Sequence, residues 1–512
     1  MADISILQIG AQDWTAQVAN LPLEWHHTTL RDLPTYLTKQ VDPFELEENY
    51  VLLTDEVLDS TLLAQQIRKW PAYRVVYIAN PDQINFDVKA ALAERRAMRF
   101  GQKTPETVGQ RIVRDLYIGQ IGFPTRFSEE QYLPQTDYRW TFERHGRFST
   151  LYEGDFGNDW TQVGTLKTFP GDFAAGQDNW MYLDYQSEGG VQVALEFVFF
   201  QNGRLQQLQI LEGDALRQMA MVKAPEKYQD YQILVLLKGQ GKIDLHALHQ
   251  RRSRHGLGLF IPGGQRELTD DGQEVLSYYN PGTKKGPLII LFAGTRLHIE
   301  GFEMMGPLNK LGYPYLLFTD SRTQGGAFDV GSEAYEAVVL NTIEKAMREA
   351  DVTPDQVIMS GYSMGSYPAM YYLANVDAGA LIVAKPIMNL GTFTASPEFP
   401  HNGLNRDWTL DVRRFLAGRM SPDDSEMMDA QLWQKLDKVN WAGKDVALFT
   451  MSEDEYDGKS LPQLLSFLKD KGVNFDHKVE KGFHEQKIDE MVKYMIDAME
   501  KEAIKMMGRR TY

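Results

Sequence analysis

Short apolar runs alternate with longer amphipathic stretches in the first part of the chain. One such amphipathic stretch, Phe86–Tyr117, has helical periodicity and many charged residues. The alternation predicts a small α/β layer domain at residues 1–120. Gly10 follows the first predicted strand, but no G-x-G-x-x-G motif accompanies it, so no nucleotide site is predicted there. Buried strands are predicted at Ile4–Ile9, Tyr50–Thr54 and Arg74–Ile78.

A different pattern follows a predicted linker at Gly122–Thr136, which contains Pro124 and Pro134. From Phe127 to Tyr231, 19 of 105 residues are aromatic, whereas aromatic residues make up 11% of the chain. Alternating, β-branched runs broken by Gly, Asp or Asn predict an antiparallel β-sandwich at residues 137–270. Aromatic side chains in a sandwich are mostly core, although exposed ones stack on sugar rings, so a carbohydrate-binding role is a secondary hypothesis.

Strands and helices alternate regularly in residues 274–512, which predicts a doubly wound parallel sheet. The predicted strands are Pro287–Ala293, Tyr315–Thr319, Gln356–Ser360, Ala380–Lys385, Asp445–Met451 and Phe475–Val479. The predicted helices are Ser332–Glu349, Met364–Asn375, Glu426–Leu436, Lys459–Asp470 and Glu485–Met507.

Composition narrows the classes of function. The 512 residues carry a formal net charge of −17, which argues against a broad nucleic-acid or anionic-membrane surface. The absence of cysteine excludes disulfides, thiolate metal sites and cysteine nucleophiles. The N-terminus has neither a basic region nor an apolar run typical of a signal peptide, and no apolar stretch approaches the roughly 20 residues of a membrane span. A cytoplasmic protein is therefore expected.

One sequence motif predicts a serine nucleophile. Gly361-Tyr362-Ser363-Met364-Gly365 follows a predicted strand and opens a predicted helix. At such a strand-to-helix elbow, small residues two before and two after the serine let the chain turn sharply and expose the serine oxygen above the sheet. The alternative is a glycine-rich turn in which the serine is incidental.

A serine nucleophile needs a base, and in α/β-hydrolases the order along the chain is nucleophile, acid, histidine. Only His401, His477 and His484 follow the motif. His401 lies in a proline-containing excursion, Ser396–Asn405, and His477 lies inside the last predicted strand. His484, just beyond that strand, is the predicted base.

The acid is expected at the end of the preceding strand, where 452–458 reads SEDEYDG. Position alone does not separate these carboxylates. We favour Glu453, the first after the strand, with Asp454 and Asp457 as alternatives.

An oxyanion hole requires two backbone N–H groups. Met364, the residue after the nucleophile, and Thr295, in the loop after an earlier strand, are the predicted donors. Asp320 and Arg322 lie at the same edge of the predicted sheet, where they either shape the pocket or form a structural ion pair.

The histidines His246, His249 and His255 lie among arginines. An H-x-x-H spacing suits a metal site, but no convincing acidic ligand completes it, so a solvated strand end is favoured and no metal is predicted.

Five segments together resemble the accessory Sec system acetyltransferase of Gram-positive cocci, within the α/β-hydrolase superfamily. The preceding α/β and aromatic β regions also resemble that family's layout, so the resemblance covers nearly the whole chain. The segments are Tyr278–Gly282, Gly286–Gly294, Gly301-Phe302-Glu303, Gly361–Ala369 and Met451–Gly458.

The resemblance implies a cytoplasmic enzyme that O-acetylates N-acetylglucosamine on serine-rich repeat adhesins. Its triad carries over to Ser363, Glu453 and His484. It also implies three kinds of partner: sibling accessory Sec subunits, the motor ATPase, and the adhesin preprotein with its glycans. Through this complex the protein would lie at the membrane only peripherally. No tightly bound cofactor is expected, and acetyl-coenzyme A is one candidate acetyl donor. The alternatives are a serine esterase acting on acylated carbohydrate and a non-catalytic adaptor of the secretion complex.

Overall fold

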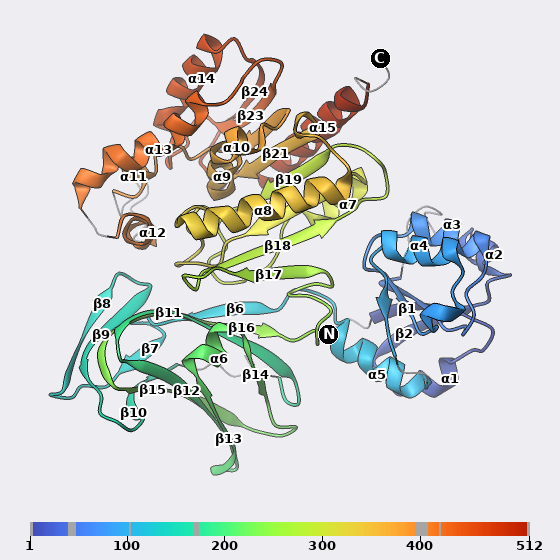
Figure 1. The fold of residues 1–512 in the computed structure, drawn as a ribbon, viewed down its shortest axis with the longest axis horizontal. Coiled ribbons are helices and arrows are strands. Elements are labelled where there is room, and N and C mark those ends of the chain that lie inside the picture. Colours follow the sequence, from blue (N-terminus) through green and yellow to red (C-terminus); the bar gives the residue numbers. More distant parts are fainter. Residues whose placement is uncertain are drawn as a thin grey trace.

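The computed structural model describes residues 4–38, 48–101, 104–167, 174–395, 408–418 and 421–508. In this described part, the strands form four sheets, so the protein is mixed α/β. Figure 1 shows the first sheet with its helices at one side of the molecule, and the two antiparallel sheets beneath the C-terminal sheet. The predicted excursion at 396–405, with His401, lies outside the described residues.

The first sheet is entirely parallel. Its strands are β1 (Ile4–Ile9), β2 (Leu23–Thr28), β3 (Tyr50–Leu53), β4 (Val75–Tyr77) and β5 (Met98–Arg99), in the order β2-β1-β3-β4-β5. Its helices are α1 (Thr15–Val18), α2 (Leu33–Leu37), α3 (Thr61–Lys69), α4 (Phe86–Glu94) and α5 (Pro105–Asp115). The three predicted strands are confirmed as β1, β3 and β4, whose apolar residues are buried. The predicted helical stretch 86–117 is interrupted by β5.

Two antiparallel sheets pack face to face next. One contains β7 (Tyr132–Pro134), β10 (Thr161–Leu166), β12 (Gln192–Gln201), β13 (Arg204–Glu212) and β15 (Asp230–Lys238), in the order β13-β12-β15-β10-β7. The other contains β8 (Trp140–His145), β9 (Ser149–Asp155), β11 (Asp178–Gly189), β14 (Ala220–Lys223) and β16 (Gln240–Arg252), in the order β14-β11-β16-β9-β8. Helix α6 (Gly213–Arg217) follows β13.

The predicted linker at 122–136 is wrong. Strand β6 (Gly122–Arg126) pairs with β16, and β7 pairs with β10. Pro124 and Pro134 suggested a linker, yet both belong to strands at the margins of these sheets, where proline is tolerated because a missing N–H does not interrupt a central ladder.

The aromatic residues of this region mainly form its core. The rings buried between the two sheets include Phe127, Tyr132, Tyr152, Phe156, Phe197 and Phe199. Trp140 is 7% exposed, and the ammonium of Lys238 lies 4.1 Å from the centre of the Trp160 ring. Most of these rings are therefore core, whereas Trp160 is half-buried beneath a lysine.

The C-terminal sheet positions the candidate site. Its strands are β17 (Gly264–Leu268), β18 (Glu274–Asn280), β19 (Leu288–Phe292), β20 (Tyr315–Thr319), β21 (Val357–Tyr362), β22 (Ala380–Ala384), β23 (Asp445–Met451) and β24 (Asn474–Glu480). The order is β17-β18-β20-β19-β21-β22-β23-β24, parallel from β20 to β24. All six predicted strands are present. Residues 264–268, which the sequence placed with the sandwich, instead pair with β18 in this sheet.

Helices cover both faces of this sheet (Figure 1). They are α7 (Met305–Leu311), α8 (Glu333–Ala350), α9 (Ser366–Tyr371), α10 (Leu373–Val376), α11 (Leu390–Phe393), α12 (Trp408–Ala417), α13 (Ser425–Asp437), α14 (Leu461–Asp470) and α15 (Ile488–Gly508). The apolar side of α8 packs on one face, and Met491, Met495 and Met499 of α15 pack on the other. Among the described residues, no helix combines the length and apolarity needed to cross a membrane.

A buried arginine joins the first sheet's unit to the rest of the protein. Arg254 is 2% exposed, and its guanidinium donates to the carbonyls of Asp115, Tyr117 and Gly119 at 2.8–3.0 Å. It also donates to the carbonyl of Phe260 and lies over the Tyr117 ring. These bonds fix the segment that leaves α5.

Candidate active site

The nucleophile candidate lies at a sharp turn between β21 and the short helix η3 (Ser363–Gly365). Ser363 has φ of 52°, a left-handed conformation that costs a non-glycine residue energy. A Cβ on Gly361 would overlap the Gly365 carbonyl, and one on Gly365 would overlap the Phe292 carbonyl. The two glycines of the motif are therefore required by close backbone approach.

Ser363 and His484 meet at the carboxyl edge of the sheet. The Nε2 atom of His484 lies 2.8 Å from the Ser363 Oγ. His484 follows β24 and is 3% exposed. The structure thus brings together two residues that are 121 positions apart, with the geometry a base needs to accept the serine proton.

The carboxylate at His484 is Asp454, so the preference for Glu453 is corrected. The Asp454 oxygens lie 3.0 and 3.1 Å from Nδ1 of His484. Beyond β23, the N–H groups of Ser452 and Glu453 still bond to carbonyls of Glu480 and Gly482. This extended pairing leaves the Glu453 side chain exposed and turns the next side chain inward.

The other carboxylates of this loop have different partners. Glu455 accepts the backbone N–H of His484 at 2.8 Å. Asp457 accepts the N–H groups of Met388 and Asn389 at 2.6 and 3.0 Å, so it anchors the loop after β22. Burial raises the pKa of Asp457 to about 6 despite these hydrogen bonds. The alternative prediction of Asp457 as the acid is therefore also wrong, because its carboxylate binds Met388 and Asn389 and not His484.

Asp454 is held as an anion. Burial opposes its charge, but the hydrogen bond and charge of His484, with the Tyr456 N–H at 3.0 Å, lower the pKa of Asp454 below its usual range. An ionised carboxylate at Nδ1 keeps a proton on that nitrogen and leaves Nε2 free to accept one.

Lys385 supports the histidine loop from the end of β22. Its side chain is 1% exposed, and its Nζ donates to the carbonyl of Gln486 at 2.6 Å. Burial lowers the pKa of Lys385, against the opposing effect of Asp454 and other carboxylates. The sequence showed it only as the last residue of a strand.

The two predicted oxyanion donors lie beside one turn. The side chain of Thr295 is adjacent to Gly325, and that of Met364 is adjacent to Gly326. The close approach of Gly365 to the end of β19 brings the loop that carries Thr295 against the elbow. The backbone after β19 therefore lies against the elbow, and the N–H groups of Thr295 and Met364 stay the predicted donors.

A polar cluster beside this loop was not predicted. The hydroxyl of Tyr362 donates to Glu303, which pairs with Arg296 at 3.2 Å. Gly294 lies against the Tyr362 ring. The cluster fixes the loop between β19 and α7. The only sequence signal was that Glu303 and Tyr362 fall in the segments carrying the family resemblance.

Asp320 and Arg322 form the structural ion pair. Their side chains are 2.7 Å apart and fully buried, and Asp320 also accepts the N–H groups of Ala327 and Asp329. These bonds organise the loop after β20.

The three histidines of the sandwich region each pair with carboxylates. His246 lies 3.2 Å from Asp184, His249 contacts Glu300, and His255 lies between Asp115 and Asp178 at 2.7 and 2.8 Å. They are buried or half-buried, so the expectation of a solvated strand end is wrong. Within the described ranges, no group of three or more His, Asp or Glu residues has a metal-binding arrangement.

A serine at a strained turn, a histidine and a buried carboxylate meet at the edge of a mainly parallel sheet, an arrangement typical of serine nucleophiles on α/β folds. The family model described as the accessory Sec system GspB-transporter matches residues 4–503. The chain belongs to this accessory Sec family.

Relatives agree with this assignment. An accessory Sec system protein of Streptococcus gordonii is 25% identical over 480 residues, 91% of both chains. The corresponding accessory Sec system protein of Staphylococcus aureus is 29% identical over 371 residues, which are 69% of this chain and 67% of that one. A chain of the glycosylation-associated protein (Gap123) complex from Streptococcus agalactiae superposes with a TM-score of 0.81, at 25% identity and 97% coverage of both chains.

Proposed function

We propose that this protein is an O-acetyltransferase that uses Ser363, His484 and Asp454 to acetylate N-acetylglucosamine on serine-rich repeat adhesins. The observation that carries the chemistry is the 2.8 Å contact between the Ser363 Oγ and Nε2 of His484, backed by Asp454 at Nδ1. Membership of the accessory Sec family supports the assignment to adhesin export.

The first half-reaction acylates the serine. His484 Nε2 takes the Ser363 proton as Oγ attacks the carbonyl carbon of the acetyl donor. The N–H groups of Met364 and Thr295 stabilise the tetrahedral oxyanion. Collapse of that intermediate breaks the bond to the donor's leaving group, which receives the proton from His484.

The second half-reaction transfers the acetyl group. A sugar hydroxyl gives its proton to His484 and attacks the acetyl carbon on Ser363. Collapse regenerates the Ser363 hydroxyl with the proton from His484 and releases the acetylated sugar. Water in place of the sugar gives ester hydrolysis, which is the alternative esterase function.

A role within a complex is a compatible second function. The similarity to a chain of the Gap123 complex covers 97% of this chain, which favours assembly with sibling accessory Sec subunits in the cytoplasm. The motor ATPase and the adhesin preprotein are the further proposed partners. In this proposal, acetylation and assembly use different surfaces.

Ser363→Ala tests the proposal. We expect the variant to lose hydrolysis of a small activated acetyl ester and, in cells, to lose acetyl groups from adhesin glycans measured by mass spectrometry. Ser452→Ala, an exposed serine of the neighbouring loop, is the matched control and should behave as the parent. Parental activity in Ser363→Ala would refute the triad. Ester hydrolysis lost with glycan acetylation unchanged would favour the esterase function.

A further inference from the structure

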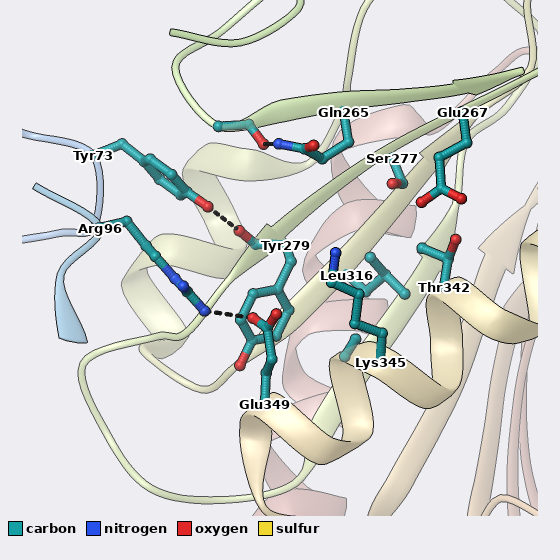
Figure 2. A pocket seen from close by; sticks show the side chains of 12 residues that line it. Tyr73, Arg96, Gln265, Glu267, Ser277, Tyr279, Leu316, Thr342, Lys345 and Glu349 are labelled. Atoms are coloured by element: carbon teal, nitrogen blue, oxygen red, sulfur yellow. Dashed lines mark hydrogen bonds and ion pairs between the residues drawn. The ribbon is translucent and has the colours of Figure 1, made fainter. Parts of the chain in front are cut away.

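A cavity of about 290 Å³ lies between α8 and the strands β17 and β18, and residues of the first sheet's unit close one end (Figure 2). Glu267 and Ser277 point from the strands toward α8, and Lys345 points from α8 toward the strands. The cavity therefore has polar groups on opposite walls.

Several of these polar groups have unused hydrogen-bonding capacity. Ser277 is 4% exposed, and its hydroxyl has no hydrogen-bond partner in the part of the chain that the structure describes. Across the same described ranges, Glu267 and Lys345 form no ion pair. The amide nitrogen of Gln265 donates to the carbonyl of Gly263 at 3.1 Å, which leaves the amide oxygen available. Gln265, Glu267 and Lys345 are exposed, and the Ser277 hydroxyl faces the open space of the cavity, so a ligand or water can satisfy all four groups.

Part of the remaining lining is apolar, and one end of the cavity is fixed in place by polar contacts. Leu316 and Ala346 line the cavity together with the half-buried ring of Tyr279. The Tyr73 hydroxyl donates to the Tyr279 carbonyl at 3.1 Å, and an ion pair between Arg96 and Glu349 closes the same end (Figure 2). The walls thus come from two units of the protein that contact each other here.

From this lining we infer that the cavity is a binding site for one uncharged sugar unit. A pyranose carries hydroxyls that both donate and accept, which suits the hydroxyl, carboxylate, amide and ammonium groups of Ser277, Glu267, Gln265 and Lys345. Its C–H face suits the apolar patch and the tyrosine ring. One free carboxylate and one free ammonium balance each other, which disfavours a phosphorylated or otherwise anionic ligand.

This site is separate from the candidate active site. Its strand residues lie at the β17 and β18 margin of the sheet, whereas Ser363 follows β21 at the carboxyl edge, with β20 and β19 between them. The inference does not rest on the proposed acetyl transfer, because no step of that reaction uses the cavity.

Saturation-transfer NMR and calorimetric titration of the full-length protein test the inference. The probes are N-acetylglucosamine, glucose and galactose, each alone, with glutamate as an anionic comparison. We expect at least one sugar to bind at millimolar concentration. Lys345→Met and Ser277→Ala should each weaken that binding about tenfold, the effect of losing one hydrogen bond to the sugar.

Glu344→Gln, on the exposed face of α8, is the matched control and should bind as the parent. Lys345 is exposed enough that its substitution leaves the fold intact, which thermal unfolding verifies. The inference is overturned if no sugar binds, if glutamate binds in preference to the sugars, or if Lys345→Met and Ser277→Ala bind as the parent does. Ester hydrolysis should be parental in both variants, which separates this result from the fate of the proposed function.

Discussion

The ring of Tyr456 lies parallel to the imidazole of His484, with the ring centres 4.0 Å apart and an angle of 3° between the planes. The Tyr456 hydroxyl donates to Glu485 at 3.1 Å, which ties the acid loop to the histidine loop. The stack therefore fixes the plane in which His484 faces Ser363.

Removing this stack should slow turnover without unfolding the protein. We expect Tyr456→Ala to lower kcat for a small acetyl ester about threefold to tenfold, the size of a typical stacking contribution. Tyr456→Phe keeps the ring and should stay close to the parent. Equal losses in both variants would show that the hydroxyl, through Glu485, matters more than the stack.

Asp454 should be the acid on which turnover depends. Asp454→Asn is expected to reduce kcat roughly a thousandfold to ten-thousandfold, because an amide at Nδ1 no longer stabilises the imidazolium or holds the required tautomer. Glu453→Gln, one residue away and exposed, is the control and should retain activity. A collapse in Glu453→Gln with activity kept in Asp454→Asn would reverse the assignment.

The elbow should not tolerate a methyl group at Gly365. Gly365→Ala would drive a Cβ into the carbonyls of Phe292 and Ala293, and we expect a loss of about 1 to 3 kcal/mol in the free energy of unfolding. Gly306→Ala, in α7, meets no atom within 4 Å and should be neutral or slightly stabilising. Denaturant unfolding of both variants measures the difference, and similar stabilities would contradict the close approach seen at the elbow.

His246 should make stability fall as pH rises. Burial disfavours its charge, but Asp184 and Asp244 outweigh burial and raise the pKa of His246 to about 10. The folded state therefore holds a proton that the unfolded chain releases near pH 6.5, so this stabilisation is complete below about pH 6.5 and is lost as pH rises toward 10.

Asp184→Asn is the variant that isolates this effect. It removes the nearer carboxylate and should flatten the fall in the free energy of unfolding, by roughly 1 to 3 kcal/mol between about pH 6 and 9. Urea unfolding across that range compares it with the parent. Identical pH profiles would mean that His246 is neutral in the folded state.

The sequence predicted the six parallel strands of the C-terminal sheet, β19 to β24, because they are short, apolar and separated by helices with clear periodicity. It also indicated Ser363 and His484, because each follows directly on a strand whose direction in a parallel sheet is known. The two glycines of the motif, Gly361 and Gly365, also indicated the sharp turn at Ser363, since close backbone approach restricts those positions to glycine.

Where the prediction failed, the determining contacts are long-range. The choice between Glu453 and Asp454 depends on how far β23 and β24 stay paired beyond their last strand residues. Strand β6 pairs with β16, more than 100 residues later, and its proline led to the prediction of a linker. The partners of His246 and His249 likewise come from distant segments, so neither burial nor charge could be inferred locally.

Arg254 has a practical consequence for dissecting the molecule. A fragment that begins after residue 120 would leave its guanidinium in the interior without the carbonyls of Asp115, Tyr117 and Gly119. An enclosed cation deprived of its acceptors is costly, so such a fragment should rearrange or precipitate. The first 120 residues therefore supply acceptors that the rest of the chain needs, and a truncated fragment would not keep the structure that it has in the full-length protein.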